Sequence, residues 1–244
     1  MSLALKLALS PLLALQALRT RARLPRLPEA QGEREGEFGA GPALRLLIAG
    51  DSSAAGVGVA HQHDALAGQL VPLLATACGA RVEWRLQARS GLNTAQTLAL
   101  LREQALPGFD IAVIVTGVND VVDRIPSSQA VAAREQLADW LRNALGVQHV
   151  VFAPLPPVHQ FPGLPQPLRW VAGRDARRHD NALARWATTR SDVSRVPVQV
   201  SLNRGAMAPD GFHPGAPVYR ECGSAIAAHI ASRVWPTMTT GAAR

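Results

Sequence analysis

Ser52 is the residue of this chain whose setting best suits nucleophilic catalysis. It follows a short apolar run, residues 44–49, which lies between glycines and is typical of a buried strand. Gly50 and Asp51 end that run abruptly. A serine at the tip of a central strand is held by a rigid scaffold and presents its hydroxyl at the edge of the sheet. The pattern therefore predicts a nucleophilic serine.

A base for this serine is available near the end of the chain. Histidine is the side chain that most often serves as a general base, and His213 is the candidate base for the Ser52 hydroxyl. Asp210, three residues before it, would accept a hydrogen bond from the other imidazole nitrogen and fix the tautomer. Pro214 disfavours a continuing helix and stiffens the loop. Together these residues predict cleavage of an ester by a serine hydrolase.

The reaction also needs hydrogen-bond donors for the negative oxygen of its tetrahedral intermediate. The backbone N–H groups of Ser52 and Gly91 and the side-chain amide of Asn119 are the candidates. Glycine suits position 91 because no Cβ blocks the approach of substrate to its backbone. Asp51 and Asp120 are interpreted as structural supports that bond to nearby loops.

The elements that must position these residues alternate between strand and helix. Expected helices run from Asp64, as a cap, to 78, from about 94 to 105, from 127 (Ser128 as cap) to 145, and over 170–190 and 217–234. The expected strands are residues 44–49, 81–88, 110–115, 147–153 and 193–200. This order predicts an α/β three-layer sandwich with a five-stranded parallel sheet. The candidate residues all follow the carboxyl ends of strands, where such sheets bind ligands.

These motifs, in this order, resemble those of the SGNH, or GDSL-type, hydrolase superfamily. Gly50-Asp51-Ser52 resembles the first block of that family, Gly91 the second, Gly117 to Asp120 the third and Asp210-x-x-His213 the last. The similarity spans about residues 44–234. It implies a flavodoxin-like sheet and ester hydrolysis without a metal or other cofactor.

The resemblance also implies site roles. Ser52, Asp210 and His213 would form the triad, and Ser52, Gly91 and Asn119 the oxyanion hole. Ser53 stands where many members carry a larger aliphatic residue, and family position assigns the nucleophile to Ser52. The expected function is that of an esterase, lipase or lysophospholipase-like enzyme. An acyltransferase or a carbohydrate O-acetyl esterase with the same triad, and a non-catalytic flavodoxin-like binding module, are the alternatives.

Composition narrows the partners and cofactors. The net charge is +7, carried almost entirely by arginine, yet the chain has one tyrosine, no zinc-ligand spacing and no RNA-reading motif, so no nucleic-acid partner is expected. His61-x-His63 lacks the further ligands of a metal site. Cys78 and Cys222 are interpreted as free thiols, with a single bridge as the alternative. The expected partner is a small-molecule ester.

The amino-terminal region forms a unit of its own in this interpretation. Residues 1–43 are an apolar and basic segment followed by a linker over 24–43, and residues 44–236 are the hydrolase domain. Only twelve residues between Lys6 and Arg19 are free of charge, whereas a spanning helix needs about twenty. We therefore expect residues 3–26 to contact the inner face of a membrane from the cytoplasm. The alternatives are an ordinary helix packed on the domain, or export if residues 1–22 act as a signal peptide.

One long loop is a candidate for the substrate pocket. Residues 155–169 are rich in proline and connect the fourth expected strand to a helix. Phe161, Leu164 and Leu168 would line an acyl or aryl pocket if the loop is functional, as long loops often are. The alternative is a plain connection between the two elements.

Overall fold

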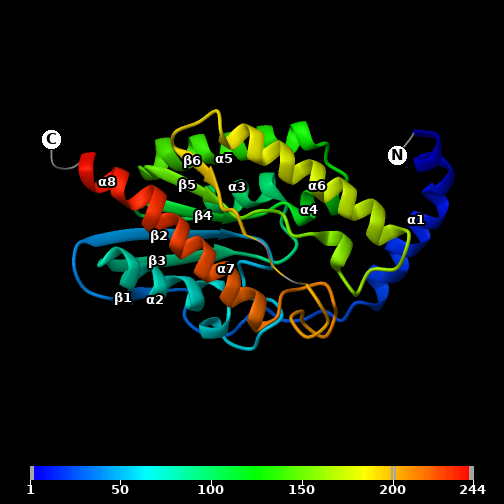
Figure 1. Ribbon diagram of the computed structural model, residues 1–244, viewed down its shortest axis with the longest axis horizontal. Coiled ribbons are helices and arrows are strands. Elements are labelled where there is room, and N and C mark those ends of the chain that lie inside the picture. The colour runs from blue at the N-terminus through cyan, green and yellow to red at the C-terminus, as the bar shows by residue number, and fades with distance from the viewer. Residues whose placement is uncertain (1–2, 199, 201, 242–244) are drawn as a thin grey trace.

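A mixed sheet of six strands forms the centre of the protein, whose computed structural model describes residues 3–198, 200 and 202–241 (Figure 1). The strand order is β1-β3-β2-β4-β5-β6. The strands are β1 (Glu35–Phe38), β2 (Ala43–Gly50), β3 (Arg81–Ala88), β4 (Ile111–Val115), β5 (His149–Phe152) and β6 (Val193–Arg195). β2 to β6 form parallel pairs, whereas β1 runs antiparallel to β3. The predicted α/β class is confirmed.

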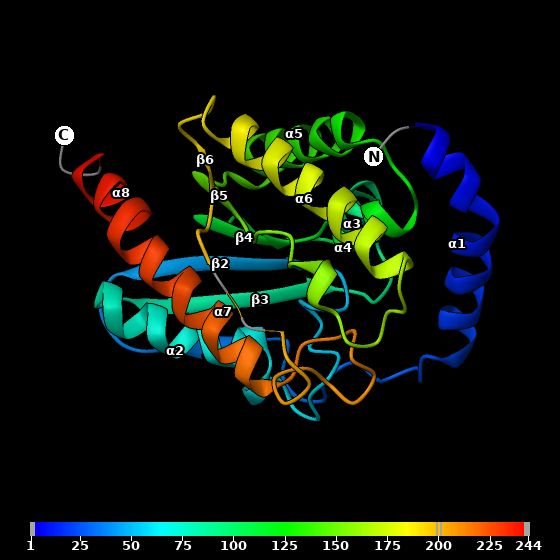
Figure 2. The ribbon, with the colours of Figure 1, turned by 45° about the vertical axis from the view of Figure 1, so that its right-hand side comes forward.

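Helices cover both faces of this sheet (Figure 2). α3, α5 and α6 pack on one face, and α2 and α7 on the other. Within the described residues the α-helices are α1 (Leu3–Arg23), α2 (Leu66–Cys78), α3 (Thr94–Arg102), α4 (Val118–Val122), α5 (Ser127–Leu145), α6 (Leu168–Ala187), α7 (Ala216–His229) and α8 (Trp235–Gly241), and a π-helical turn, Ile230–Val234, joins α7 to α8. The three layers agree with the expected sandwich.

Strand β2 shows why the sheet can be covered twice. Leu47 and Ala49 belong to the core on the α3–α5–α6 side, while Leu46 and Ile48 belong to the core on the α2–α7 side. Successive side chains of a strand point to opposite faces, so a strand buried on both faces needs a continuous apolar run. The carboxyl end of β2, at Gly50, pairs with the ends of β3 and β4. The loops after these strands therefore leave the sheet along one edge.

The stretch 24–43 is more than the linker predicted from its composition. Residues Glu35–Phe38 form β1, which adds a sixth strand at the edge of the sheet. All four of its residues are exposed, so burial gives no sequence signal. Two cross-strand ion pairs, Arg85 with Glu35 and Arg81 with Glu37, join β1 to β3. The prediction of a purely parallel five-stranded sheet is corrected accordingly.

Several element boundaries also differ from the sequence-based expectation. Asp64 lies in a short 3-10 turn and does not cap α2, which begins at Leu66. Ser128 lies inside α5, whose N-cap position is Pro126. The last strand is shorter than the expected range 193–200, because β6 ends at Arg195. Helix α4 was not predicted, since it has only five residues and begins in the loop after β4.

Helix α1 stands at one end of the molecule, beside the start of α6 (Figure 2). The Gln16 amide donates to the carbonyl of Gln166 at 2.7 Å, and its oxygen accepts from the N–H of Leu168 at 3.1 Å. Among the described helices, none combines the length and apolar character needed to cross a bilayer. Cys78 and Cys222 are both free thiols, as preferred from the sequence.

Candidate active site

Ser52 lies in the loop directly after β2, an inner strand of the sheet that lies between β3 and β4. Gly50 makes that turn possible, because a Cβ at this position would lie 2.0 Å from the carbonyl oxygen of Val115. The same carbonyl accepts a hydrogen bond of 3.1 Å from the N–H of Asp51. The turn that presents Ser52 is therefore bound to the end of β4.

The structure brings Ser52, His213 and Asp210 together in one hydrogen-bonded line. The Ser52 Oγ is 3.1 Å from Nε2 of His213, and Nδ1 of His213 is 2.6 Å from Oδ2 of Asp210. With a proton on Nδ1, the imidazole donates to Asp210 and accepts from the Ser52 hydroxyl. The neighbouring Ser53 instead uses its N–H to bond Oδ1 of Asp51 at 2.9 Å.

Asp210 is arranged to remain ionised beside the imidazole. Its side chain is fully buried, whereas that of His213 is 20% exposed. Burial alone would raise the pKa of Asp210, but hydrogen bonds from the imidazole and from the N–H groups of His213 and Phe212 outweigh burial. The pKa of Asp210 therefore lies below its ordinary value, and the carboxylate favours the tautomer that leaves Nε2 free to accept.

Asn119 lies in α4, the short helix that follows β4. Its Nδ2 donates to the carbonyl of Leu92 at 3.0 Å and lies 3.5 Å from Oδ2 of Asp51. The Asn119 amide is thus held between the loop after β3 and the loop after β2. Leu92 is itself placed by the adjoining Asn93, which forms a capping box with Gln96 at the start of α3.

Gly91 belongs to the same loop and is exposed. Its φ of +85° is a left-handed conformation that favours glycine, and a Cβ there would face open space. Neither the N–H of Gly91 nor that of Ser52 is hydrogen-bonded to an acceptor in the described part of the chain. Both N–H groups are therefore available to a ligand at this edge of the sheet.

Asp51 is buried below these loops, at 3% exposure. Removal from water raises its pKa to about 7, although the hydrogen bond from Ser53 and the nearby His213 both act in the opposite direction. The predicted supporting role fits its contacts with Ser53 and Asn119, because both hold loops next to Ser52. Asp51 is not hydrogen-bonded to the His213 imidazole, which is paired with Asp210.

A small apolar cavity of about 110 Å³ opens beside Ser52 and His213. Phe161 lines it, as expected for the proline-rich loop, together with Phe212 and residues of α7. Leu164 and Leu168 do not line it; Leu164 is buried in the adjoining core and Leu168 packs against that core. The other apolar lining residues include Leu66, Val115, Val118, Leu155, Val198, Val200, Leu202, Met207, Val218 and Ile226.

A sequence model of the GDSL-like lipase/acylhydrolase family matches residues 48–221, a range that begins before Ser52 and ends beyond His213. The chain belongs to this family. The SGNH resemblance is thereby confirmed, and the protein is an SGNH-type hydrolase of the esterase and lipase group. No curated protein sequence matches the chain.

Solved structures of similar shape support the fold of this GDSL-like hydrolase. The lipase Lip_vut3 from a goat rumen metagenome has a TM-score of 0.61 at 18% identity, covering 78% of this chain and 98% of that one. The Clostridium thermocellum family 3 carbohydrate esterase has a TM-score of 0.61 at 14% identity, covering 80% and 98%. A catalytic mutant of the acetylxylan esterase Axe2 from Geobacillus stearothermophilus has 0.58 at 17%, covering 81% and 97%.

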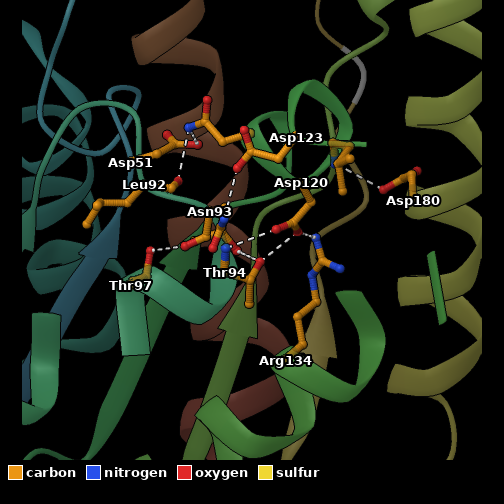
Figure 3. A network of polar contacts seen from close by, with 12 residues as sticks. Asp51, Leu92, Asn93, Thr94, Thr97, Asp120, Asp123, Arg134 and Asp180 are labelled. Atoms are coloured by element: carbon orange, nitrogen blue, oxygen red, sulfur yellow. Dashed lines mark hydrogen bonds and ion pairs between the residues drawn. The ribbon is translucent and has the colours of Figure 1, made fainter. Parts of the chain in front are cut away.

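Asp120 belongs to a second polar cluster of this GDSL-like hydrolase, which includes Thr94 and Arg134 (Figure 3). Its carboxylate accepts from the N–H of Thr94 at 3.0 Å, from the Thr94 hydroxyl at 2.7 Å and from Nη2 of Arg134 at 3.0 Å. Asp120 and Arg134 have side-chain exposures of 1% and 0%. The predicted supporting role of Asp120 fits these contacts, which join α4 to α3 and α5.

Arg134 was missed by the sequence analysis, although a signal exists. It lies on the same side of α5 as the buried Ala130, Leu137 and Leu141, at helical spacing. A charged residue on an apolar helix face indicates a buried partner. Burial lowers the pKa of Arg134, which Asp120 opposes, and its Nε and Nη1 have no partner among the described residues.

His61 and His63, the other candidate ligands, stack with ring centroids 5.5 Å apart, and neither of them lines the cavity. His63 also pairs with Asp64 at 3.0 Å. Over the described part of the chain, no group of three or more His, Cys, Asp or Glu side chains is placed to hold a metal ion.

Proposed function

We propose that this GDSL-like hydrolase cleaves carboxylic esters through an acyl-enzyme intermediate. Ser52 is the nucleophile, His213 the general base and Asp210 the carboxylate that orients the imidazole. The observation that carries the proposal is the unbroken line from Oγ of Ser52 to Nε2 of His213 (3.1 Å) and from Nδ1 of His213 to Asp210 (2.6 Å). Residues 161 positions apart meet within hydrogen-bond distance next to an apolar cavity.

In the first half of the reaction, Oγ of Ser52 attacks the carbonyl carbon of the ester while Nε2 of His213 takes its proton. The imidazolium is stabilised by the ionised Asp210. Collapse of the tetrahedral intermediate breaks the bond to the alcohol oxygen, which leaves with the proton from Nε2. The acyl group remains on Ser52 as an ester.

Negative charge develops on the carbonyl oxygen during both halves of the reaction. The N–H groups of Ser52 and Gly91 and the Nδ2 of Asn119 are the donors we assign to it. Two features support this assignment: neither N–H has a described acceptor, and Asn119 is already fixed by Leu92. Donors that need no rearrangement stabilise the transition state without a reorganisation cost.

In the second half, a water molecule gives a proton to Nε2 of His213 and attacks the acyl carbon. The new tetrahedral intermediate releases the carboxylic acid and returns the proton to Oγ of Ser52. Because water accepts the acyl group, the reaction is a hydrolysis rather than an acyl transfer to another alcohol. The cavity beside Ser52 is the space assigned to the acyl group during this step.

The size of that cavity favours a short acyl chain. Its volume of about 110 Å³ is well below the roughly 300 Å³ at which pockets for larger ligands begin. The apolar lining excludes charged acyl groups because their desolvation would go uncompensated.

Hydrolysis of p-nitrophenyl esters by the wild-type protein and two serine variants tests this function. Ser52→Ala should lower kcat/KM by about 10⁵-fold, since the nucleophile is lost. Ser53→Ala is the matched control and should keep most of the activity, because the N–H of Ser53, not its hydroxyl, holds Asp51. Full activity in Ser52→Ala contradicts the proposal. Among chain lengths, acetate and butyrate should exceed octanoate, and the reverse order contradicts the assignment of the cavity.

A carbohydrate O-acetyl ester is the second candidate substrate, and the small cavity favours it. An acetyl group fits the available volume. Two structures of similar fold are described as a carbohydrate esterase and an acetylxylan esterase, at 14% and 17% identity. Release of acetate from acetylated xylan, compared with release of p-nitrophenol from its acetate, distinguishes the two candidates. No acetate from the polysaccharide eliminates the second.

A further inference from the structure

Helix α1 has an apolar side that the rest of the protein does not cover. Leu12, Leu15 and Leu18 are 43%, 44% and 68% exposed. Their spacing places them along one side of the helix. Leu13, Gln16 and Ala17 are less exposed than these leucines, and Gln16 is hydrogen-bonded to the carbonyl of Gln166 and the N–H of Leu168. The three leucines of this row are therefore left exposed on α1, the helix that stands at one end of the molecule (Figure 2).

A cluster of positive charge lies at the carboxyl-terminal end of α1 and in the residues that follow it. Arg19, Arg21, Arg23 and Arg26 are all exposed, and none forms an ion pair with a carboxylate in the described part of the chain. The sequence has no Asp or Glu before Glu29. This region thus presents leucines and arginines with no negative side chain to repel an anionic surface.

We propose that α1 binds the protein to the surface of a membrane that contains anionic lipids, with Leu12, Leu15 and Leu18 in the acyl-chain boundary and Arg19, Arg21, Arg23 and Arg26 at the headgroups. A helix with exposed apolar residues and adjacent arginines has the chemistry of an interfacial helix. Positive side chains near anionic headgroups add attraction that falls off within a Debye length. An acidic protein would satisfy the arginines but leave the leucine row to be covered separately.

The contact of α1 with the domain gives this binding an orientation. Gln16 bonds to Gln166 and Leu168, at the end of the segment that begins with Pro154. That segment lines the cavity through Pro154, Leu155 and Phe161. When α1 binds a membrane, this contact should therefore keep the cavity-lining loop close to the membrane-bound helix. The binding itself is independent of the proposed ester hydrolysis.

Flotation of the full-length protein with lipid vesicles tests the proposal. Vesicles of equal parts phosphatidylglycerol and phosphatidylcholine should carry the wild-type protein at least about tenfold better than phosphatidylcholine alone. The variant Leu12→Gln/Leu15→Gln/Leu18→Gln and the variant Arg19→Gln/Arg21→Gln/Arg23→Gln/Arg26→Gln should each lose about tenfold or more of this binding. High salt should weaken wild-type binding. Circular dichroism shows whether each variant keeps its fold.

Arg177→Gln/Arg178→Gln is the matched control, because these two arginines are exposed on α6. It should bind vesicles as the wild-type protein does. No flotation of the wild-type protein, or equal flotation of the leucine variant, overturns the proposal. So does a wild-type dimer that the leucine variant converts to a monomer while neither binds vesicles, since a second copy then covers the leucine row.

Discussion

The Asp210–His213 pair and the Asp120–Arg134 pair each join a carboxylate to a basic side chain near the same edge of the sheet. The first faces the cavity: the His213 side chain is 20% exposed and reaches Ser52. The second is sealed: neither partner exceeds 1% exposure, and Thr94 covers the remaining side of Asp120. In both pairs a carboxylate is bonded to a basic side chain, but only the first pair is open to the cavity.

The difference teaches how chemistry separates from support in this protein. Histidine exchanges its proton near neutral pH and can act as a base. Arginine remains charged, so its partner gains a fixed hydrogen bond rather than a proton relay. Asp210 and His213 lie in one loop, whereas Asp120, Arg134 and Thr94 come from three helices. The pair that we propose to be reactive is local, and the Asp120–Arg134 pair joins distant parts of the chain.

Among the changes that test this comparison, His213→Ala should have the largest effect on activity. Without a base, Ser52 loses its activation, and kcat for a p-nitrophenyl ester should fall by about 10⁴-fold to 10⁶-fold. The free energy of unfolding should change far less than for the buried pair, because His213 is partly exposed. Initial rates of ester hydrolysis measure kcat, and urea denaturation of the same sample measures the free energy of unfolding. A variant that keeps its activity contradicts the role of His213.

The converse change, Arg134→Met, should act on stability. It leaves Asp120 buried without its charged partner, and the free energy of unfolding should fall by about 3–5 kcal/mol. The double variant Asp120→Asn/Arg134→Met should recover part of this loss, since an amide oxygen can still accept from Thr94 and no buried charge remains. Urea denaturation measures both variants. Unchanged stability in Arg134→Met would show that the sealed pair is not a support.

Asp51 sharpens the comparison because it is a buried carboxylate with no basic partner. Its pKa in the folded protein is about 7, above the unfolded value, so the folded state binds the extra proton. Stability from this residue is fully present below the unfolded pKa of about 4 and is lost as the pH rises through 7. Between pH 5 and 7.5, loss of the Asp51 proton should lower the free energy of unfolding by about 2–3 kcal/mol.

The variant Asp51→Asn keeps an oxygen for the N–H of Ser53 and removes the titrating group. Between pH 5 and 7.5 its free energy of unfolding should fall by about 2–3 kcal/mol less than that of the wild-type protein. Urea denaturation at several pH values measures the slope. Equal slopes in the two proteins would show that Asp51 does not titrate there.

The sequence allowed the site to be predicted because its residues follow strands that are apolar on both faces. The runs that became β2 and β4 are buried and continuous, so their ends, and the residues after them, are easily placed. Parallel strands bring such ends to one edge. The residues alone offer two adjacent serines, Ser52 and Ser53, and the family resemblance assigns the nucleophile to Ser52; in the structure Ser52 is the one that reaches His213.

Features that depend on partners far along the chain were not predictable in the same way. Strand β1 has no buried residue and is held by pairing with β3, including the Arg85–Glu35 ion pair. A charged edge strand of this kind also discourages association with another sheet. The apolar face of α5 could indicate that Arg134 is buried, but only the fold shows that Asp120 is its partner. Propensity and periodicity describe local preference, and these contacts are tertiary.

The central claim, that His213 activates Ser52, is tested most directly by labelling with a fluorophosphonate probe and mapping the site by mass spectrometry. Trypsin releases both serines in one peptide, residues 46–81, and fragmentation of that peptide distinguishes them. We predict that the label is on Ser52 in the wild-type protein and is lost in His213→Ala. A label on Ser53, or equal labelling of Ser52 without His213, would contradict the account.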